Sequence, residues 1–174
     1  NKDKLKYVMQ LKNEQRGRIS EYEKKYPKAK FFAKDKPWKV ACDIAIPCAT
    51  ENELSQSDAK NLIKNGVIAV AEGANMPCTP EAIKAFQNSK VLYAPGKASN
   101  AGGVAVSGLE MAQNSLKNTW SRKIVDGKLQ EIMTDIHSSC LEYGKEKNSI
   151  DYLKGANIAG FVKVADAMLA QGVV

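Results

Sequence analysis

Short apolar runs alternate with helix-forming segments through the middle of this chain. The runs occupy residues 40–46, 67–71 and 91–94. Each run is short, nearly continuous and bounded by proline, glycine or asparagine, which is typical of a strand buried on both faces. Between them lie segments long enough for helices. The alternation predicts βαβ units and therefore a parallel sheet, which places the chain in the α/β class.

The clearest helix start is Thr79-Pro80-Glu81, which combines an N-cap residue, a proline at the first helical position and an acid in the first turn. This helix is predicted to reach about Gln87. Another is predicted to begin at Ser55 or Ser57 and to end near Gly66. The remaining predicted elements are a helix over residues 4–26 that Gly17 interrupts, a short strand over 30–33, and helices over 121–144 and 157–172.

Three unusual loops follow the predicted strands, over residues 47–52, 72–79 and 95–103. Right-handed crossovers place the carboxyl ends of parallel strands at one edge of the sheet. Ligands of open α/β sheets bind at that edge. Asn and Thr recur in these loops as neutral donors and acceptors, so the pattern is consistent with a nucleotide site.

The third loop leads into a helix that is predicted to begin near Asn100, a good N-cap residue. Gly102 and Gly103 are poor helix formers, so we expect the backbone there to approach something closely. Val104 and Ser107 share one helical face. An apolar residue and a hydroxyl near an anion-attracting helix start suit a small ligand with a hydrocarbon body and a carboxylate. The alternative is tight helix–strand packing, with Ser107 a plain polar position.

The net charge of +7 is concentrated near the start, where residues 2–39 hold thirteen of the lysines and arginines. A solvated basic face is the simpler interpretation, because no nucleic-acid-binding motif accompanies the charge. No zinc site is expected, because the four cysteines show no C-x-x-C spacing and His137 is the single histidine. His137 is interpreted as structural. Cys42 and Cys48, beside an apolar run, are expected to be buried in a reduced compartment.

Several common signatures are missing from the sequence. It contains no G-x-G-x-x-G, no P-loop and no G-x-S-x-G. No apolar run reaches the roughly 20 residues that cross a bilayer, and no leader-like segment opens the chain, so the prediction is a cytoplasmic protein without a membrane partner. The chain begins at Asn1 in the middle of a helical pattern, which favours a fragment: the second half of a Rossmann-like dinucleotide-binding domain, followed by C-terminal helices.

Four blocks of sequence carry a family resemblance: PCATENEL at 47–54, AVAEGANMPCTPEA at 69–82, LYAPGKASNAGGVAVSGLEMAQNS at 92–115 and GANIAGFVKVADAMLAQGV at 155–173. Together they resemble the C-terminal part of glutamate dehydrogenase, most of all the hexameric, NADP-linked type. The resemblance covers almost the whole chain. It implies an enzyme that converts L-glutamate reversibly to 2-oxoglutarate and ammonia, with hydride transfer to a nicotinamide coenzyme.

The resemblance also implies roles for individual residues. Ser107 would bind the side-chain carboxylate of glutamate, and Val104 would line its aliphatic pocket. The nicotinamide end of the coenzyme would lie along Ala49, Thr50, Asn75 and Asn100. NADP is preferred over NAD, because the adenosine phosphate of NADP needs cationic partners. The block LKNEQRGRISEY supplies Lys12, Arg16 and Arg18 in the corresponding region.

In the family the catalytic lysine and aspartate lie in an N-terminal substrate domain, so no catalytic residue is expected in this chain. The expected division is a coenzyme-binding part over residues 1–120 and C-terminal helices over 121–174 that pack back toward that substrate domain. Two other functions remain open. One is a basic module that binds nucleic acid through its N-terminal lysines, and the other is an oligomerisation domain that uses its C-terminal helices. Glycine-rich turns at three strand ends favour the dehydrogenase.

Overall fold

The computed structural model describes residues 1–172, so residues 173 and 174, the end of the predicted helical part, lie outside the described residues. The chain forms two compact units, residues 1–37 and 38–174. Each is considered by itself.

The first unit is built from short helical pieces instead of one long helix. Helix α1 (Lys2–Met9) continues as a π-helical turn, η1 (Gln10–Glu14), and after a break come a 3₁₀ turn, η2 (Ile19–Glu21), and α2 (Tyr22–Lys25). The break lies at Arg16, whose φ of 52° is left-handed. Gly17 follows, and a Cβ there would lie 2.5 Å from a methyl of buried Leu11. The predicted interruption is confirmed, whereas the predicted strand over 30–33 is wrong: this segment has no strand partner in the described chain.

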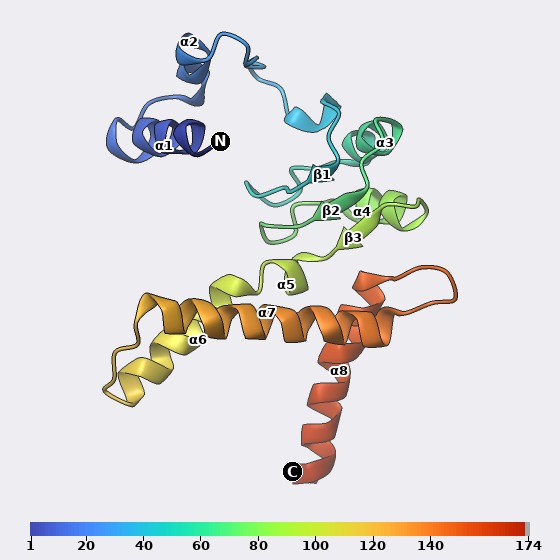
Figure 1. Cartoon of the computed structure of the whole chain (residues 1–174). Helices are drawn as coiled ribbons and strands as arrows, with labels where there is room; N and C mark the ends of the chain where they lie inside the picture. Colours follow the sequence, from blue (N-terminus) through green and yellow to red (C-terminus); the bar gives the residue numbers. More distant parts are fainter. Residues whose placement is uncertain (173–174) are drawn as a thin grey trace. The chain divides into compact units, whose positions relative to one another are not determined.

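The second unit contains a parallel sheet with strand order β1–β2–β3 (Figure 1). The strands are β1 (Ile44–Ala45), β2 (Ala69–Ala71) and β3 (Leu92–Ala94), and all pair in parallel. The prediction of a parallel α/β sheet is therefore confirmed. The strands are shorter than the apolar runs, because Val67 still donates its N–H to Leu62 in the preceding helix and residues 40–42 have no partner in β2.

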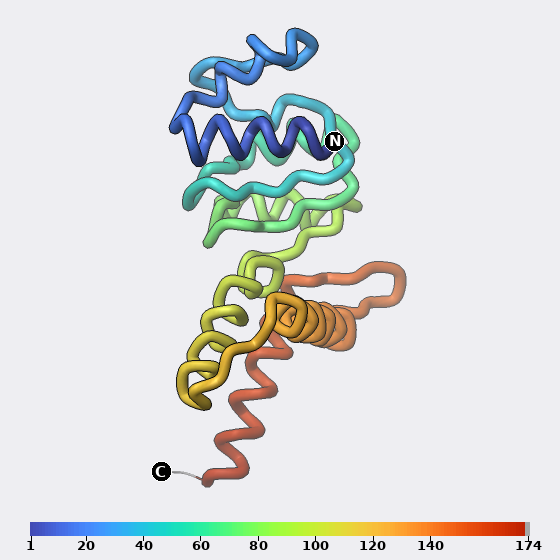
Figure 2. The backbone as a smooth tube through the Cα atoms, turned by 60° about the vertical axis from the view of Figure 1, so that its left-hand side comes forward, coloured from blue at the N-terminus to red at the C-terminus, as the bar shows by residue number. Residues whose placement is uncertain are grey.

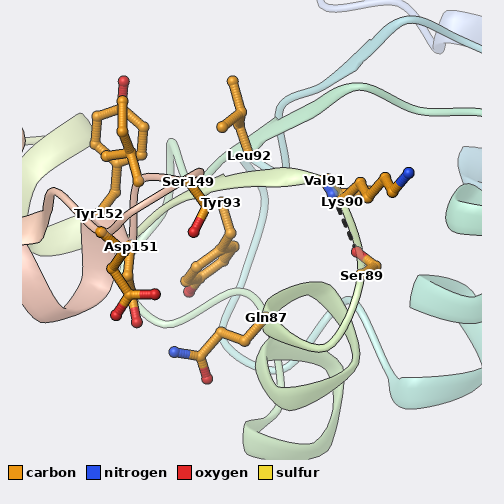
Figure 3. A pocket seen from close by; sticks show the side chains of 11 residues that line it. Gln87, Ser89, Lys90, Val91, Leu92, Tyr93, Ser149, Asp151 and Tyr152 are labelled. Carbon is orange, nitrogen blue, oxygen red and sulfur yellow. Dashed lines mark hydrogen bonds between the residues drawn. The ribbon is translucent and has the colours of Figure 1, made fainter.

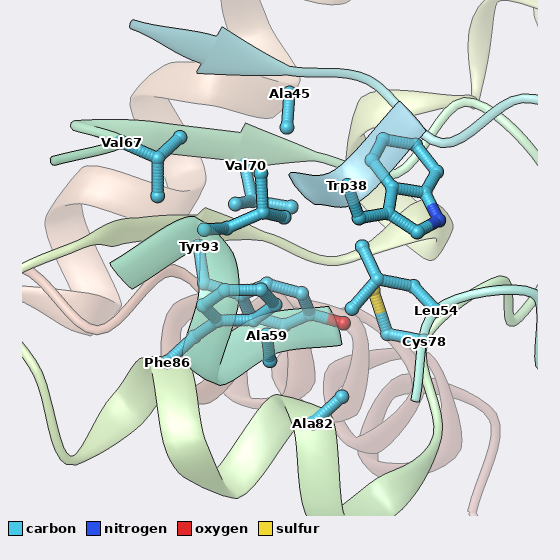
Figure 4. Packing of buried hydrophobic residues seen from close by; sticks show 11 residues of the cluster. Trp38, Ala45, Leu54, Ala59, Val67, Val70, Cys78, Ala82, Phe86 and Tyr93 are labelled. Carbon is cyan, nitrogen blue, oxygen red and sulfur yellow. The ribbon is translucent and has the colours of Figure 1, made fainter. Parts of the chain in front are cut away.

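Two helices cover one face of this sheet. They are α3 (Gln56–Lys64), capped by Ser55, and α4 (Pro80–Gln87), capped by Thr79 as predicted. Ala45, Val70 and Tyr93 pair across the strands in one row, and all three are buried. They pack with Trp38, Leu54, Leu62 and Phe86 in the core (Figure 4). The row on the other face begins with Ile44 and ends with Leu92, both of which are exposed.

The rest of the unit is helical. A short helix α5 (Gly96–Ser99) leads into α6 (Gly102–Ser115), and α7 (Arg122–Gly144) and α8 (Tyr152–Gln171) follow. Figures 1 and 2 both show α8 extending away from the sheet. Helices α7 and α8 touch where a Cβ on Gly155 would lie 2.1 Å from the carbonyl oxygen of Cys140. None of the helices within residues 1–172 is long and apolar enough to span a membrane.

The predicted start of the last helix at Asn157 is wrong. Helix α8 begins at Tyr152, because Asp151 accepts a hydrogen bond from the N–H of Lys154 and forms the N-cap. Asn157 lies inside the helix, where its side chain accepts from the ammonium of Lys97 at 2.7 Å.

Candidate functional site

Backbone hydrogen bonds join the loops that follow β1 and β2. Gly73 and Ala74 donate their N–H groups to the carbonyl of Pro47 at 2.9 and 3.0 Å. Further along, Asn52 donates to Met76 at 2.9 Å. Asn52 and Met76 both have left-handed φ angles, of 53° and 48°. Two non-glycine residues in this conformation mark backbone strain, which often accompanies functional loops.

The three strand-end loops and the start of α6 line one groove of about 650 Å³, which is open to solvent. Six residues singled out in the sequence line it, from all three loops and from α6: Ala49, Thr50, Asn75, Asn100, Val104 and Ser107. The structure therefore brings these six together, as expected of the carboxyl edge of a parallel sheet.

Asn100 does not cap the helix, which corrects the sequence prediction. Helix α6 begins at Gly102 after Ala101, without a side-chain cap. The amide of Asn100 instead donates to the carbonyl of Ala74 at 3.0 Å and to Oδ1 of Asn75 at 2.7 Å. The residue thus joins the second loop to the third.

Val104 and Ser107 lie on the wall that α6 contributes to the groove. Val104 is 78% exposed, so its side chain packs against little within this chain. Among the described residues, the hydroxyl of Ser107 has no hydrogen-bond partner. An apolar side chain and an unengaged hydroxyl, one helical turn apart, are available to a ligand.

Glu72, which no pattern in the sequence singled out, is a buried charged residue of the core region and is 4% exposed. Its carboxylate accepts hydrogen bonds from the backbone of Cys78 at 3.3 Å and of Gly96 at 2.7 Å. Burial raises the pKa of the Cys78 thiol, and the neighbouring Glu72 carboxylate raises it further. Burial and a hydrogen bond to Glu72 raise the pKa of Tyr93 in the same way. An acid directly after a buried apolar run is the signal that could have identified it.

Lys12, Arg16 and Arg18 belong to the first unit, whereas the groove is formed by residues of the second. All three are exposed. The ammonium of Lys12 donates to the carbonyl of Gly17 at 3.1 Å. The guanidinium groups of Arg16 and Arg18 have no partner among the described residues, so both remain available to an anion.

Two titratable side chains line the groove, those of Cys48 and Glu51. His137 is exposed on α7, and its Nε2 lies 3.2 Å from the hydroxyl of Tyr152. Cys48 lines the groove and is exposed, whereas burial was expected. The loop after β1 places its sulfur at the groove surface, beside Gly73. Residues 1–172 bring together no group of three or more side chains suited to a metal ion.

A second, smaller cavity of about 150 Å³ lies near the amino end of β3 (Figure 3). Gln87 at the end of α4 and Asp151 and Tyr152 at the start of α8 contribute to its lining. None of the residues singled out in the sequence lines it. Its position away from the carboxyl ends of the strands makes the larger groove the better candidate for a binding site.

Comparison with known proteins identifies the family of this chain. The sequence model of the Glutamate/Leucine/Phenylalanine/Valine dehydrogenase family matches residues 3–172, and the chain belongs to this family. Glutamate dehydrogenase of Bacteroides thetaiotaomicron is 59% identical over 174 residues, which are 99% of this chain and 39% of the relative. The NADP-specific glutamate dehydrogenase of Escherichia coli is 54% identical, over 99% of this chain and 38% of the relative. The NAD-specific enzyme of Porphyromonas gingivalis is 53% identical, over 98% and 38%.

A solved structure confirms the fold. The crystal structure of Plasmodium falciparum glutamate dehydrogenase superposes with a TM-score of 0.91 at 48% identity, and the match covers 100% of this chain and 38% of that one. This chain therefore spans less than two fifths of the length of these relatives.

Proposed function

We propose that this chain is part of a glutamate dehydrogenase and forms the second half of its coenzyme-binding domain, followed by C-terminal helices. The whole protein would catalyse the reversible oxidative deamination of L-glutamate to 2-oxoglutarate and ammonia. The observation that carries the proposal is the convergence of six residues from three strand-end loops and α6 on one groove. The glutamate dehydrogenase names of the relatives support the same activity.

The groove fits the nicotinamide end of a coenzyme on chemical grounds. Its loop side offers neutral donors and acceptors from Thr50, Asn75 and Asn100, beside small residues such as Ala49 and Gly73. A carboxamide and a ribose need this kind of lining. A bound coenzyme would supply the acceptor for the hydride of glutamate. The α6 side, with Val104 and Ser107, would hold the side chain of the amino acid close by.

NADP is the coenzyme that we propose, with NAD as the second choice. The names of the relatives do not decide the question, because NADP-specific and NAD-specific enzymes are almost equally similar to this chain. The exposed guanidinium groups of Arg16 and Arg18 favour NADP, since arginine binds phosphate through paired hydrogen bonds. Lys12 contributes less, because its ammonium already bonds to Gly17.

The exposed apolar surface of α8 supports the proposal that the substrate domain packs against the C-terminal helices. Phe161, Val164, Met168 and Leu169 are between 60% and 82% exposed. Such a surface favours burial against further protein. We propose that the substrate domain, with the catalytic lysine and aspartate, covers it, and that the whole protein assembles as a hexamer. The mass of the purified protein in solution measures the assembly.

The test uses the full-length protein that contains this chain. We expect glutamate-dependent reduction of NADP⁺, and we expect a maleimide to modify Cys48 and to abolish this activity. NADPH should slow modification of Cys48, because the thiol lies in the groove wall, while buried Cys78 and Cys140 serve as internal controls in peptide mass spectra. The proposal is contradicted if glutamate does not reduce NADP⁺. It is also contradicted if the maleimide modifies Cys48 equally fast with and without NADPH.

A further inference from the structure

Glu72 is a buried carboxylate that accepts one backbone hydrogen bond at each oxygen, from the N–H of Cys78 at 3.3 Å and from the N–H of Gly96 at 2.7 Å. The thiol of Cys78 and the hydroxyl of Tyr93 face the same carboxylate, which raises the pKa of both groups. In Figure 4 this hydroxyl lies on the Cys78 side of the core cluster. These residues form what we call the Glu72 cluster: Glu72, Cys78, Tyr93 and Gly96. A buried charge is tolerated where hydrogen bonds replace the lost water, as they do here.

The cluster holds two loops of the groove against each other. Glu72 opens the loop that carries Asn75, and Gly96 belongs to the loop that leads to Asn100. The backbone of Glu72 adds two further bonds, because its carbonyl accepts from Ser99 Oγ at 2.6 Å and its N–H donates to Ala94 at 3.1 Å. A Cβ on Gly96 would stand 3.2 Å from Oε2 of Glu72, so a glycine lets the backbone approach the carboxylate.

These two loops fix the hydrogen-bonding polarity of the groove. The carbonyl of Ala74 can only accept, so the amide nitrogen of Asn100 must face it. The same nitrogen then requires the oxygen of Asn75 as its second acceptor. The amide nitrogen of Asn75 and the oxygen of Asn100 remain, one donor group and one acceptor side by side, in two residues that line the groove.

We infer that Glu72 is a positioning residue of the reaction: it touches no ligand itself and fixes the loops that place Asn75 and Asn100 at the reacting end of the groove. This inference rests on the proposed function. Displacement by about 1 Å at a reacting centre costs on the order of a hundredfold in rate. A buried anion that accepts from both loops prevents such a displacement.

Both oxygens of Glu72 are needed in this arrangement, because each accepts one backbone N–H, from Cys78 at Oε1 and from Gly96 at Oε2. In Glu72→Gln one oxygen becomes an NH₂ group, which would face a donor of Cys78 or Gly96. A buried N–H then loses its acceptor, and the loops must move apart or take up water.

The first experiment measures Glu72→Gln in the full-length enzyme. We expect kcat for glutamate to fall about tenfold or more, while the dissociation constant of the coenzyme changes by less than about threefold, because its phosphate end is bound elsewhere. Glu81→Gln is the matched control: it removes one carboxylate from the exposed first turn of α4, and its kinetics should equal those of the wild type. A kcat of Glu72→Gln within about twofold of the wild type overturns the inference.

Gly96→Ala provides an independent perturbation of the same cluster. Its Cβ would meet the carbonyl of Ala74 at 3.0 Å as well as Glu72. It should give the same loss of kcat with retained coenzyme affinity, and the double variant should lose less than the product of the two effects. If Glu72→Gln does not fold, Gly96→Ala decides by the same criteria. Effects that multiply fully in the double variant show that the residues act separately, which overturns the inference.

A readout without substrate separates this inference from the proposed function. Cys78 should react with a maleimide at least about tenfold faster in Glu72→Gln than in the wild type, relative to Cys140, because opening of the loops exposes its thiol. If the wild-type protein does not oxidise glutamate, the proposed function fails, and this rate still decides whether Glu72 holds the loops. An unchanged rate for Cys78 shows that it does not.

Discussion

Replacement of Ser107 by alanine tests the assignment of the glutamate pocket most directly. The hydroxyl of Ser107 lines the groove without a partner in the described chain, one turn beyond Val104 on α6. Removal of the hydroxyl therefore breaks no bond within this chain. Any effect on kinetics must come through a ligand or through protein that lies outside this chain.

The magnitude follows from the contact that is lost. A hydrogen bond to a charged group contributes about 1.5–3 kcal/mol. Because the groove is open and a bound carboxylate there keeps some water, we expect the lower part of this range, about 1.5–2 kcal/mol. The Michaelis constants for glutamate and 2-oxoglutarate should then rise about 10- to 30-fold. Coenzyme affinity should barely change, because the loops that line the rest of the groove keep their hydrogen bonds.

The assay compares glutamate with norvaline in steady-state kinetics of the full-length enzyme. Norvaline has no side-chain carboxylate, so the loss of Ser107 should affect it far less. Ser107→Thr keeps the hydroxyl and should retain most of the affinity for glutamate. Equal losses for glutamate and norvaline would show that Ser107 has a packing role, and the assignment would be wrong.

Four further predictions concern the full-length protein or this chain. Alanine at both Arg16 and Arg18 should weaken NADP by about 1.5–3 kcal/mol more than NAD; equal effects in coenzyme titrations would remove both residues from the phosphate site. The isolated chain should show no turnover in a glutamate assay with NADP, because the substrate domain is missing; turnover at the rate of the full-length enzyme would contradict this. Gly155→Ala should lower the free energy of unfolding by about 3 kcal/mol, since its Cβ would meet a carbonyl of α7 at 2.1 Å. Gly160→Ala, where nothing lies within 4 Å, is the control and should be neutral or stabilising in the same denaturant titration. Met76→Gly should stabilise by about 0.5–1 kcal/mol through relief of a left-handed φ of 48°, and a lower melting temperature would refute that reasoning.

The arrangement of the groove could be predicted from sequence because it follows from topology. Once three short apolar runs are assigned to parallel strands, the loops after them must meet at one edge. Side chains from those loops, such as Thr50, Asn75 and Asn100, line the groove with no further information about packing. The start of α4 could be predicted for a local reason, since Thr79 accepts a hydrogen bond from Ala82, three residues away.

The errors arose where a distant partner competes with a local pattern. Asn100 is a good N-cap residue, yet its amide bonds to Ala74 and Asn75, 26 and 25 residues away in sequence. The sequence predicts a helix start at Asn157, whereas Asp151 caps the helix and Asn157 bonds to Lys97 across 60 residues. The role of Glu72 depends on Gly96, 24 residues further along the chain. Local patterns contain no information about such contacts.

The groove separates two kinds of lining, and this has a consequence for divergence of the fold. The loop side is held in place by main-chain hydrogen bonds, such as those from Gly73 and Ala74 to Pro47, and by the side-chain amide of Asn100. The α6 side presents Val104 and Ser107, whose side chains form no hydrogen bonds among residues 1–172. Mutation at these two positions can alter the shape and polarity of the pocket and leave the loop framework intact. If the groove binds the amino acid and the coenzyme as proposed, a duplicated gene would acquire a new amino-acid preference in a few steps, while the loop side stays under separate selection.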